Sequence, residues 1–350
     1  MNKPVLWNTI PKQIRVSIHT KPIKIEIPHN ITIFISDPQQ KDDPQQKDIS
    51  EKIRTWFEFI LPYCSPQCVK PLSIYLYLTP FEKRLPANNT PIGEINANTA
   101  FTQICSPTLS HNEIVIFRKE EWLKVLYHET FHTMGLDFSY ISESDNITTK
   151  YIGQHLFCGI HVPTIKLYET YCEVWAIVFY MKYNEPTNKK QPQKEKHPNK
   201  KKQQQKEVAF SLFQLVKVLG HAGFTYNELI HTTNKMEITN EMTTKTTTTT
   251  TTTTTNETYK EHTSVLAYYV LKAIAIFYLD EYMKWIHGRI RFLTEHTDAK
   301  KDILHYAEFF CIYGRKPAFL RKIRQMELFM NDPETQQDED LMTTLRMTSL

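Results

Sequence analysis

Apolar and polar residues alternate near the start of the chain. Apolar side chains occupy every second position over residues 23–27 and 31–35, and Val16 and Ile18 add a shorter alternating run. A period of two is typical of strands that bury one face, and the prolines and asparagines between the runs favour turns. The pattern predicts two or three antiparallel strands within residues 15–36.

The next apolar runs predict one helix and three further strands. Residues 49–60 have the spacing of an amphipathic helix, with Ser50 as a candidate cap at its start. Residues 72–78 and 114–117 are short apolar runs of the kind that form buried strands. Residues 94–104 are predicted to form another strand, which polar residues mark as an exposed edge.

Helical periodicity dominates the second half of the chain. Residues 165–183 are apolar over most faces, which predicts a core helix, whereas residues 136–159 show neither period and are predicted to be a loop. Residues 264–279 are apolar apart from Lys272, but this run is shorter than the ~20 residues that span a membrane, so a buried helix is predicted there. The other predicted helices cover 208–219, 263–286, 299–312 and 317–330.

Three segments have low sequence complexity. Residues 37–48 repeat Asp-Pro-Gln-Gln-Lys-Asp, residues 184–207 are rich in Lys, Gln, Asn and Pro, and residues 232–258 contain ten consecutive threonines. Such segments bury too little apolar surface to order themselves. They are predicted to be a flexible loop and two disordered insertions, and the polar residues 331–350 are predicted to be a flexible tail.

The net charge of +4 conceals an uneven distribution. Residues 189–206 carry eight lysines and one glutamate; without them the 42 basic and 38 acidic side chains of the chain become 34 and 37. A near-neutral body argues against nucleic-acid binding, although the Lys-rich tract alone stays an alternative contact for nucleic acid.

The cysteines and the first residues bear on the compartment of the protein. Of six cysteines only Cys64 and Cys68 lie close together, a weak metal signal without a second pair, so free thiols in a reducing compartment are expected. Residues 1–10 lack the apolar run of a secretory signal. An intracellular protein without a membrane span is therefore expected.

The most specific motif is H-E-x-x-H, formed by His128, Glu129 and His132. Histidines four residues apart on a helix lie on one face, where both rings can bind one zinc ion, and the adjacent glutamate can reach a water on that ion. The surroundings agree with this reading, because the acidic pair Glu120–Glu121 suits the first turn of a helix and Gly135 suits the position after its end.

A catalytic zinc site needs a third protein ligand, and two places could supply it. In the H-E-x-x-H-x-x-G-x-x-H pattern the ligand follows the glycine by three residues, but position 138 is Phe, and Asp137 comes one residue early. The alternative is a glutamate on a second helix. Glu169 and Glu173 lie one turn apart in the apolar helix at 165–183, where carboxylates need partners, and this arrangement is favoured.

The segment Glu169-Thr170-Tyr171-Cys172-Glu173-Val174-Trp175-Ala176 resembles the E-x-x-x-D-x-x-A helix that follows H-E-x-x-H in CAAX prenyl protease-like enzymes. Its first part is also similar to the E-x-x-x-D of thermolysin and neprilysin relatives. Residues 114–183 thus resemble gluzincin-type zinc metallopeptidases, with Glu in place of Asp. The resemblance implies that Glu169 ligates zinc, that Glu173 hydrogen-bonds a zinc-binding histidine, and that an edge strand pairs with substrate.

The expected fold is α+β and zincin-like, with a small mixed sheet packed on the active-site helix and a mostly helical C-terminal part. The expected organisation is N-terminal β strands in 1–36, a low-complexity loop in 37–48, a zincin-like catalytic core in 49–183, a disordered insertion in 184–207, a helix in 208–231, a second disordered insertion in 232–258, a helical C-terminal part in 259–330 and a flexible tail in 331–350.

The expected function is that of a zinc-dependent peptidase acting on a peptide or protein substrate. Zn²⁺ would polarise the scissile carbonyl and lower the pKa of its water towards 7, and Glu129 would take the proton and pass it to the leaving amine. A residue from a later helix would stabilise the oxyanion, with Tyr268, Tyr269, His221 and His262 as candidates.

The alternative function is that of a catalytically silent structural or interaction protein that keeps a metal-binding zincin fold. The intact Glu129 favours the enzyme, because a purely structural site has no need of a base there. The Lys-, Asn- and Thr-rich segments resemble proteins from AT-rich genomes, such as those of large DNA viruses or protists, so a viral or virion-associated protein is one expectation.

Overall fold

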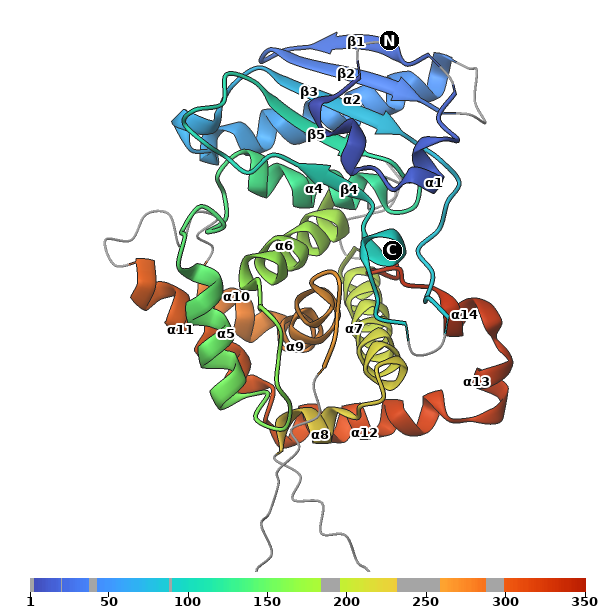
Figure 1. Ribbon diagram of the computed structural model, residues 1–350, viewed down its shortest axis with the longest axis vertical. Helices are drawn as coiled ribbons and strands as arrows, with labels where there is room; N and C mark the ends of the chain where they lie inside the picture. The colour runs from blue at the N-terminus through green and yellow to red at the C-terminus, as the bar shows by residue number, and fades with distance from the viewer. Residues whose placement is uncertain are drawn as a thin grey trace, which may run out of the picture.

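The computed structural model of the chain describes residues 3–19, 21–37, 43–87, 90–183, 196–231, 259–287 and 299–350. Over these residues the fold is α+β, as the sequence predicts. A mixed sheet forms one end of the molecule and a mostly helical part forms the other (Figure 1).

The sheet has five strands in the order β1-β2-β3-β5-β4. The hairpin of β1 (Ile23–Ile27) and β2 (Ile31–Ser36) is antiparallel, and β3 (Leu72–Tyr77) and β5 (Asn112–Ile116) run parallel to β2. The short β4 (Ala100–Thr102) runs antiparallel to β5 and forms one edge. The sheet therefore ends, on the side of β5, in an edge strand of opposite direction.

The predicted strand around residues 15–18 is wrong. A 3-10 helix η1 (Val5–Thr9) and a short helix α1 (Lys12–Arg15) occupy this part, and β1 and β2 are the only strands among the described residues before 37. Ile14 and Ile18, four residues apart, pack on one face of the sheet while Val16 is exposed. The buried positions thus follow a helical period that the alternation of Val16 with Ile18 concealed.

The other face of the sheet carries the main core. Here α2 (Asp43–Ile60) and α4 (Trp122–Thr133) lie against the sheet (Figure 1). Their apolar side chains share one core with the inward-facing isoleucines and leucines of β2, β3 and β5. Helix α2 begins at Asp43, so the second hexapeptide copy at 43–48 is helical and not a loop. Ser50 is no cap, because its hydroxyl donates to Lys47 O within the helix, and residues 38–42 lie outside the described residues.

Two further predictions need correction. The segment predicted as one strand over 94–104 contains a helical turn α3 (Glu94–Ala97) before β4, although β4 does form the expected edge. The segment predicted as a loop over 136–159 contains the helix α5 (Ser144–His155), which packs against the later helix α11 (Ala299–Tyr313). Its weak amphipathic pattern gave no clear period in the sequence.

The C-terminal half is helical. Helix α6 (Leu167–Tyr183) packs against α4, and the helix predicted over 263–286 is divided at Tyr278. Within the described residues no helix is both long and apolar enough to cross a membrane. The other elements are α7 (Lys196–His221), α8 (Tyr226–Ile230), the π-helical η5 (Leu266–Leu271), α9 (Lys272–Phe277), α10 (Leu279–Ile286), α11 (Ala299–Tyr313) and α12 (Pro317–Met330).

Two of the segments predicted as disordered or frayed are ordered in part. Residues 196–207 belong to α7, so the prediction of a disordered insertion is wrong there; residues 184–195 and 232–258 lie outside the described residues. The predicted flexible tail contains α13 (Pro333–Gln337) and α14 (Glu339–Thr343). Beyond α14 the chain returns to the space between the sheet and α7, where its side chains are partly buried (Figure 1).

Candidate metal centre

Helices α4 and α6 bring three candidate ligand atoms together. His128 and His132 share one face of α4, and their Nε2 atoms lie 3.1 Å apart. Glu169, in the first turn of α6, places Oε2 3.0 Å from His128 Nε2 and 3.3 Å from His132 Nε2. The three atoms form a nearly equilateral triangle.

The opposite ring nitrogens face carboxylates. His128 Nδ1 lies 3.1 Å from Glu173 Oε2, and His132 Nδ1 makes a short hydrogen bond with Asp137 Oδ2. An ionised carboxylate can only accept a hydrogen bond, so each Nδ1 carries the hydrogen. In the neutral rings the Nε2 lone pairs then point, with the Glu169 oxygen, at one shared position.

A cation placed between these three acceptors would be bound by all of them. Two ligand atoms at ~2.0–2.1 Å from a tetrahedral zinc ion are about 3.3 Å apart, close to the separations of this triangle. A set of two imidazoles and one carboxylate also matches the donor types that zinc prefers at catalytic sites. The residues present therefore fit a zinc ion.

The electrostatics of the site also favour positive charge beside Glu169. Burial alone would lower the pKa of His128, but its hydrogen bonds with Glu169 and Glu173 raise it above the ordinary value. Burial alone would raise the pKa of Glu169, but His132 and His128 hold it well below its usual range. The two imidazoles thus favour the ionised form of Glu169.

Glu129 differs from the other acidic residues of the site. Its side chain is buried, and burial raises the pKa of its carboxyl group, an effect that His128 and His132 partly offset. No hydrogen bond to this carboxylate is found among the residues that the structure describes. It lines the same small pocket as His128 and Tyr268, so it is available to a molecule bound there.

Lys124 holds Glu173, the carboxylate that faces His128. This role of Lys124 was not predicted from the sequence. Its Nζ lies 2.7 Å from Glu173 Oε1, and both side chains are about 1% exposed. Lys124 holds the pKa of Glu173 well below its usual range, against the effect of burial. The signal in the sequence was a lysine one turn before His128 on the same helical face.

Asp137 supports the His132 side. It was the alternative third ligand, but it lies at the Nδ1 of His132, away from the triangle of ligand atoms. Ser139 donates to Asp137 Oδ1 through its backbone N–H and its hydroxyl, at 3.1 and 2.8 Å, and the Cys172 thiol donates to Oδ2 at 3.4 Å. His132, Asp137 and Cys172 lie close enough to hold a metal themselves, but this grouping would use the ring nitrogen that Asp137 already occupies.

The two tyrosines predicted as candidates for stabilising the oxyanion lie in different surroundings. Tyr268 lines the pocket, with its ring centroid 6.1 Å from that of His128, and burial together with Glu169 raises its pKa well above the ordinary value. Tyr269 is directed elsewhere, since its hydroxyl donates to Leu345 O at 2.6 Å. Of the two histidine candidates, His221 contacts Thr90 O through its ring Nε2. The backbone N–H of His262 donates a hydrogen bond to Ile92 O.

Helix α4 does not begin as predicted. Glu121 is the residue before the helix, with a left-handed backbone at φ 56°, and there is no acidic residue in the first turn. Its carboxylate pairs with Lys83 Nζ at 2.5 Å, and both side chains are at most 1% exposed. Gly135 does follow the end of the helix, with φ 64° as predicted for a terminal glycine.

The pocket beside Glu129 has a volume of about 40 Å³, enough for a few water molecules. One wall comes from residues 97–100, which lead into the edge strand β4. Lys83, Lys124 and Val125 form another part, and Met347 closes it from the end of the described chain. The pocket therefore lies between the edge strand and α4.

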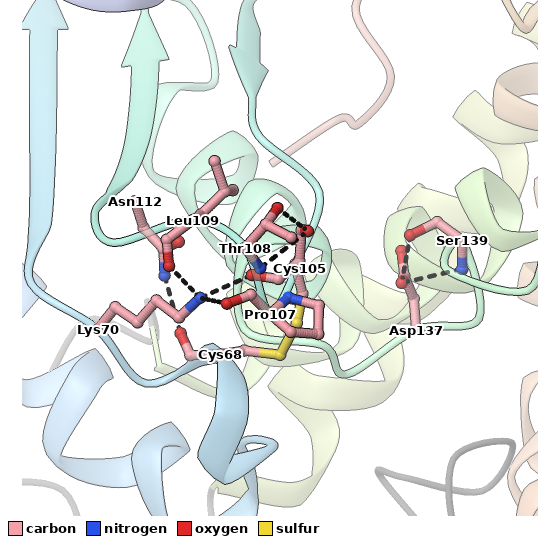
Figure 2. Close-up of a disulfide and its surroundings, with 10 residues drawn as sticks. Cys68, Lys70, Cys105, Pro107, Thr108, Leu109, Asn112, Asp137 and Ser139 are labelled. Atoms are coloured by element: carbon pink, nitrogen blue, oxygen red, sulfur yellow. Dashed lines mark hydrogen bonds between the residues drawn. A yellow bond between two sulfur atoms is a disulfide. The ribbon is translucent and has the colours of Figure 1, made fainter.

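A disulfide between Cys68 and Cys105 lies at the far end of α4 (Figure 2). The Cα atoms are 5.4 Å apart, and the Cys105 N–H donates to His132 O at 3.0 Å. A Cβ at Gly135 would come within 2.7 Å of Cys68 Sγ. The expectation of free thiols is wrong for these two residues, because loops distant in sequence bring them together.

The chain was compared with protein-family models, with curated proteins and with solved structures, and none of the three comparisons gave a match.

Proposed function

We propose that the protein is a zinc-dependent peptidase of the gluzincin type, with a zincin-like core. The observation that carries the proposal is the convergence of His128 Nε2, His132 Nε2 and Glu169 Oε2 within 3.3 Å, with a carboxylate behind each imidazole. Carboxylates in that position fix the ring tautomer and orientation, as they do for metal-bound histidines in general. The three protein ligands leave a fourth position open for water.

When bound, zinc would supply Lewis-acid polarisation of the scissile carbonyl and acidify a water molecule. Glu129 lies beside the ligands without a hydrogen-bond partner in the described part of the chain, which suits a general base. It would take the proton of the attacking water and give it to the leaving amine. Tyr268, directed into the same pocket, would donate its hydroxyl hydrogen to the developing oxyanion.

The edge strand offers a place for an extended peptide. Thr99 O accepts from the Phe117 N–H, and the Gln103 N–H donates to Glu113 O, so the backbone groups of the residues at odd positions face β5. The alternation of a strand then turns the backbone groups of Ala100 and Thr102 towards the free edge. A peptide that pairs with this edge adds a strand to the sheet. Its scissile bond would then pass the pocket that contains Glu129, because residues 97–100 line that pocket.

The test is metal content and peptide hydrolysis of the purified protein. We expect about one zinc per chain, hydrolysis of unstructured peptides, and loss of hydrolysis with a chelator. Glu129→Gln should keep the metal and lose ~100- to 10,000-fold in rate, the usual contribution of a general base. Glu51→Gln is the matched control, since Glu51 is exposed and distant in sequence from the site.

Two outcomes would contradict the proposal. A chain that contains zinc but hydrolyses no peptide would favour the catalytically silent alternative. A Glu129→Gln variant with a near-normal rate would exclude this residue as the base.

A further inference from the structure

Residues 345–349, called the strap below, cross the N-terminal end of α4. Their backbone is bound by three charged side chains from distant parts of the chain. Glu121 accepts from the N–H groups of Met347 and Thr348 at 3.0 and 2.8 Å. Lys272 donates to Met347 O at 2.6 Å, and Glu207 accepts from the Ser349 N–H at 2.8 Å.

The three charged side chains that bind the strap are buried, so they hold it firmly in place. Glu121, Lys272 and Glu207 are almost fully excluded from solvent. A buried charge is costly unless it is paired and hydrogen-bonded, so displacing the strap would leave each of them short of partners. The hydroxyls of Thr348 and Ser349 also donate to Glu207, so the strap is held by several contacts that do not involve the Met347 side chain.

The side chain of Met347 is directed from the strap into the pocket beside Glu129. It is 5% exposed, and its sulfur lies 3.9 Å from Lys124 Nζ. It belongs to the same apolar cluster as Ala97 and Tyr268, which line the pocket on other sides. Met347 therefore forms the wall of the pocket that is supplied by the far end of the described chain.

Most of the charged groups of the pocket are paired. Lys83 is paired with Glu121, and Lys124 is paired with Glu173, while Glu129 adds a carboxylate without a hydrogen-bond partner in the described part of the chain. Ala97, Ala100, Val125 and Met347 supply the aliphatic part of the lining, and the volume is about 40 Å³. Such a space accepts a small group and excludes a long one.

We infer that Met347 determines specificity: its side chain limits the pocket so that the substrate residue beside the scissile bond carries a small side chain. The inference rests on the proposed peptidase function for the nature of the substrate. The shape of the pocket, however, can be tested without turnover.

The test compares Met347→Ala with the wild type, using zinc-loaded protein. The probes are acetohydroxamate and 3-phenylpropanohydroxamate, which bind zinc through the same group and differ in the size of the group beside it. Calorimetry gives their affinities, and a peptide set that varies one position next to the cleavage site gives the cleavage preference. Met347→Leu, of similar size, and Met342→Ala, a truncation outside the strap, are the controls.

Met347→Ala should improve the affinity of the larger hydroxamate relative to the smaller one by ~10-fold or more, the scale at which pockets discriminate small changes in apolar size. Peptide cleavage should shift in the same direction, from small to large apolar side chains. Both controls should behave like the wild type. Met347→Val, a milder truncation, replaces Met347→Ala if the latter does not fold, and should shift both preferences less.

The outcomes separate the inference from the proposed function. An unchanged hydroxamate ratio in a folded Met347→Ala or Met347→Val variant overturns the inference, whether or not peptides are cleaved. A shifted ratio without any peptide cleavage supports the role of Met347 in shaping the pocket and contradicts the peptidase. A wild-type protein that binds no zinc would overturn both the inference and the proposed function.

Discussion

The two ends of helix α4 are held by different means. At the N-terminal end, buried charges bind one another and a segment that is 226 residues away, as between Glu121 and Met347. At the C-terminal end, Gly135 turns the chain, the Cys68–Cys105 disulfide lies against it, and Asp137 binds His132 from five residues away. One end depends on distant electrostatic contacts, and the other on local geometry and a covalent bond.

The difference extends to the two candidate metal-binding histidines. His128 is oriented by Glu173, which comes from α6 and is itself held by Lys124. His132 is oriented by Asp137, which is held by Ser139 two residues further on. We therefore expect the support of His128 to be sensitive to the packing of the whole molecule, and the support of His132 to tolerate changes far from the turn.

The largest expected effect is the loss of the metal itself. Glu169→Ala removes one of the three converging atoms and should strip zinc almost completely. Glu173→Ala and Asp137→Ala each remove only the partner of a histidine, and should weaken zinc affinity by ~10- to 100-fold. Competition with a chromogenic chelator measures all three.

The ranking of these variants is decisive. Should Glu173→Ala lose the metal while Glu169→Ala keeps it, the assignment of ligand and supporting residue is reversed. Should all three keep full affinity, the third ligand lies elsewhere.

The second effect is on stability at the N-terminal end. Lys124→Met leaves Glu173 buried without its cation, and breaking a buried pair in this way costs ~3–5 kcal/mol of unfolding free energy. The double variant Lys124→Met/Glu173→Gln should cost less than Lys124→Met alone, because no unpaired charge remains. Urea unfolding of the single and double variants measures the difference. A single variant as stable as the wild type would show that the pair is not needed.

The third effect concerns the covalent clamp at the C-terminal end. The disulfide closes a loop with a sequence separation of 37, so Cys68→Ser/Cys105→Ser should lose ~3–4 kcal/mol of unfolding free energy on the chain-entropy account. A reductant should lower the melting temperature of the wild type and leave that of the double variant unchanged. A wild type insensitive to reductant would mean that the bond contributes nothing measurable.

The smallest effect separates backbone strain from close contact at the turn. Gly135→Ala and Gly223→Ala both place a side chain at positive φ, 64° and 81°, which costs ~1–2 kcal/mol. Only at Gly135 would the added Cβ meet a neighbour, Cys68 Sγ at 2.7 Å, whereas none lies within 4 Å at Gly223. Gly135→Ala should therefore be the more destabilising in thermal unfolding, and equal effects would show that the loop around the disulfide yields easily.

The same contrast explains what could be predicted from the sequence. The convergence of His128, His132 and Glu169 follows from helical spacing within α4 and α6, and the strands β2, β3 and β5 follow from short apolar runs. These patterns are local, so they are visible in the residues themselves. The contact of Glu173 with His128 also lies where the E-x-x-x-E spacing put it.

The features that were missed depend on contacts between distant segments. Glu121 was predicted to lie in the first turn of the helix, where the helix dipole favours negative charge. Instead it pairs with Lys83, 38 residues earlier, and binds the strap. The strap lies in the segment 331–350 that was predicted to be a flexible tail, because much of its anchoring is done by backbone groups, which leave no mark in the amino-acid pattern. Cys68 precedes β3 and Cys105 follows β4, so their contact depends on how β3, β5 and β4 pair in the sheet.

The position of the strap also has a consequence for the order of events during synthesis. A ribosome adds ~5–20 residues per second, so Met347 leaves it about 10–45 s after Glu121, which lies 226 positions earlier. Throughout that interval Lys83 and Glu121 can pair, because both have already been made, but the wall that Met347 contributes does not exist. A nascent chain would thus be able to assemble the histidines and Glu169 first, and would complete the pocket beside Glu129 only after Met347 has been made.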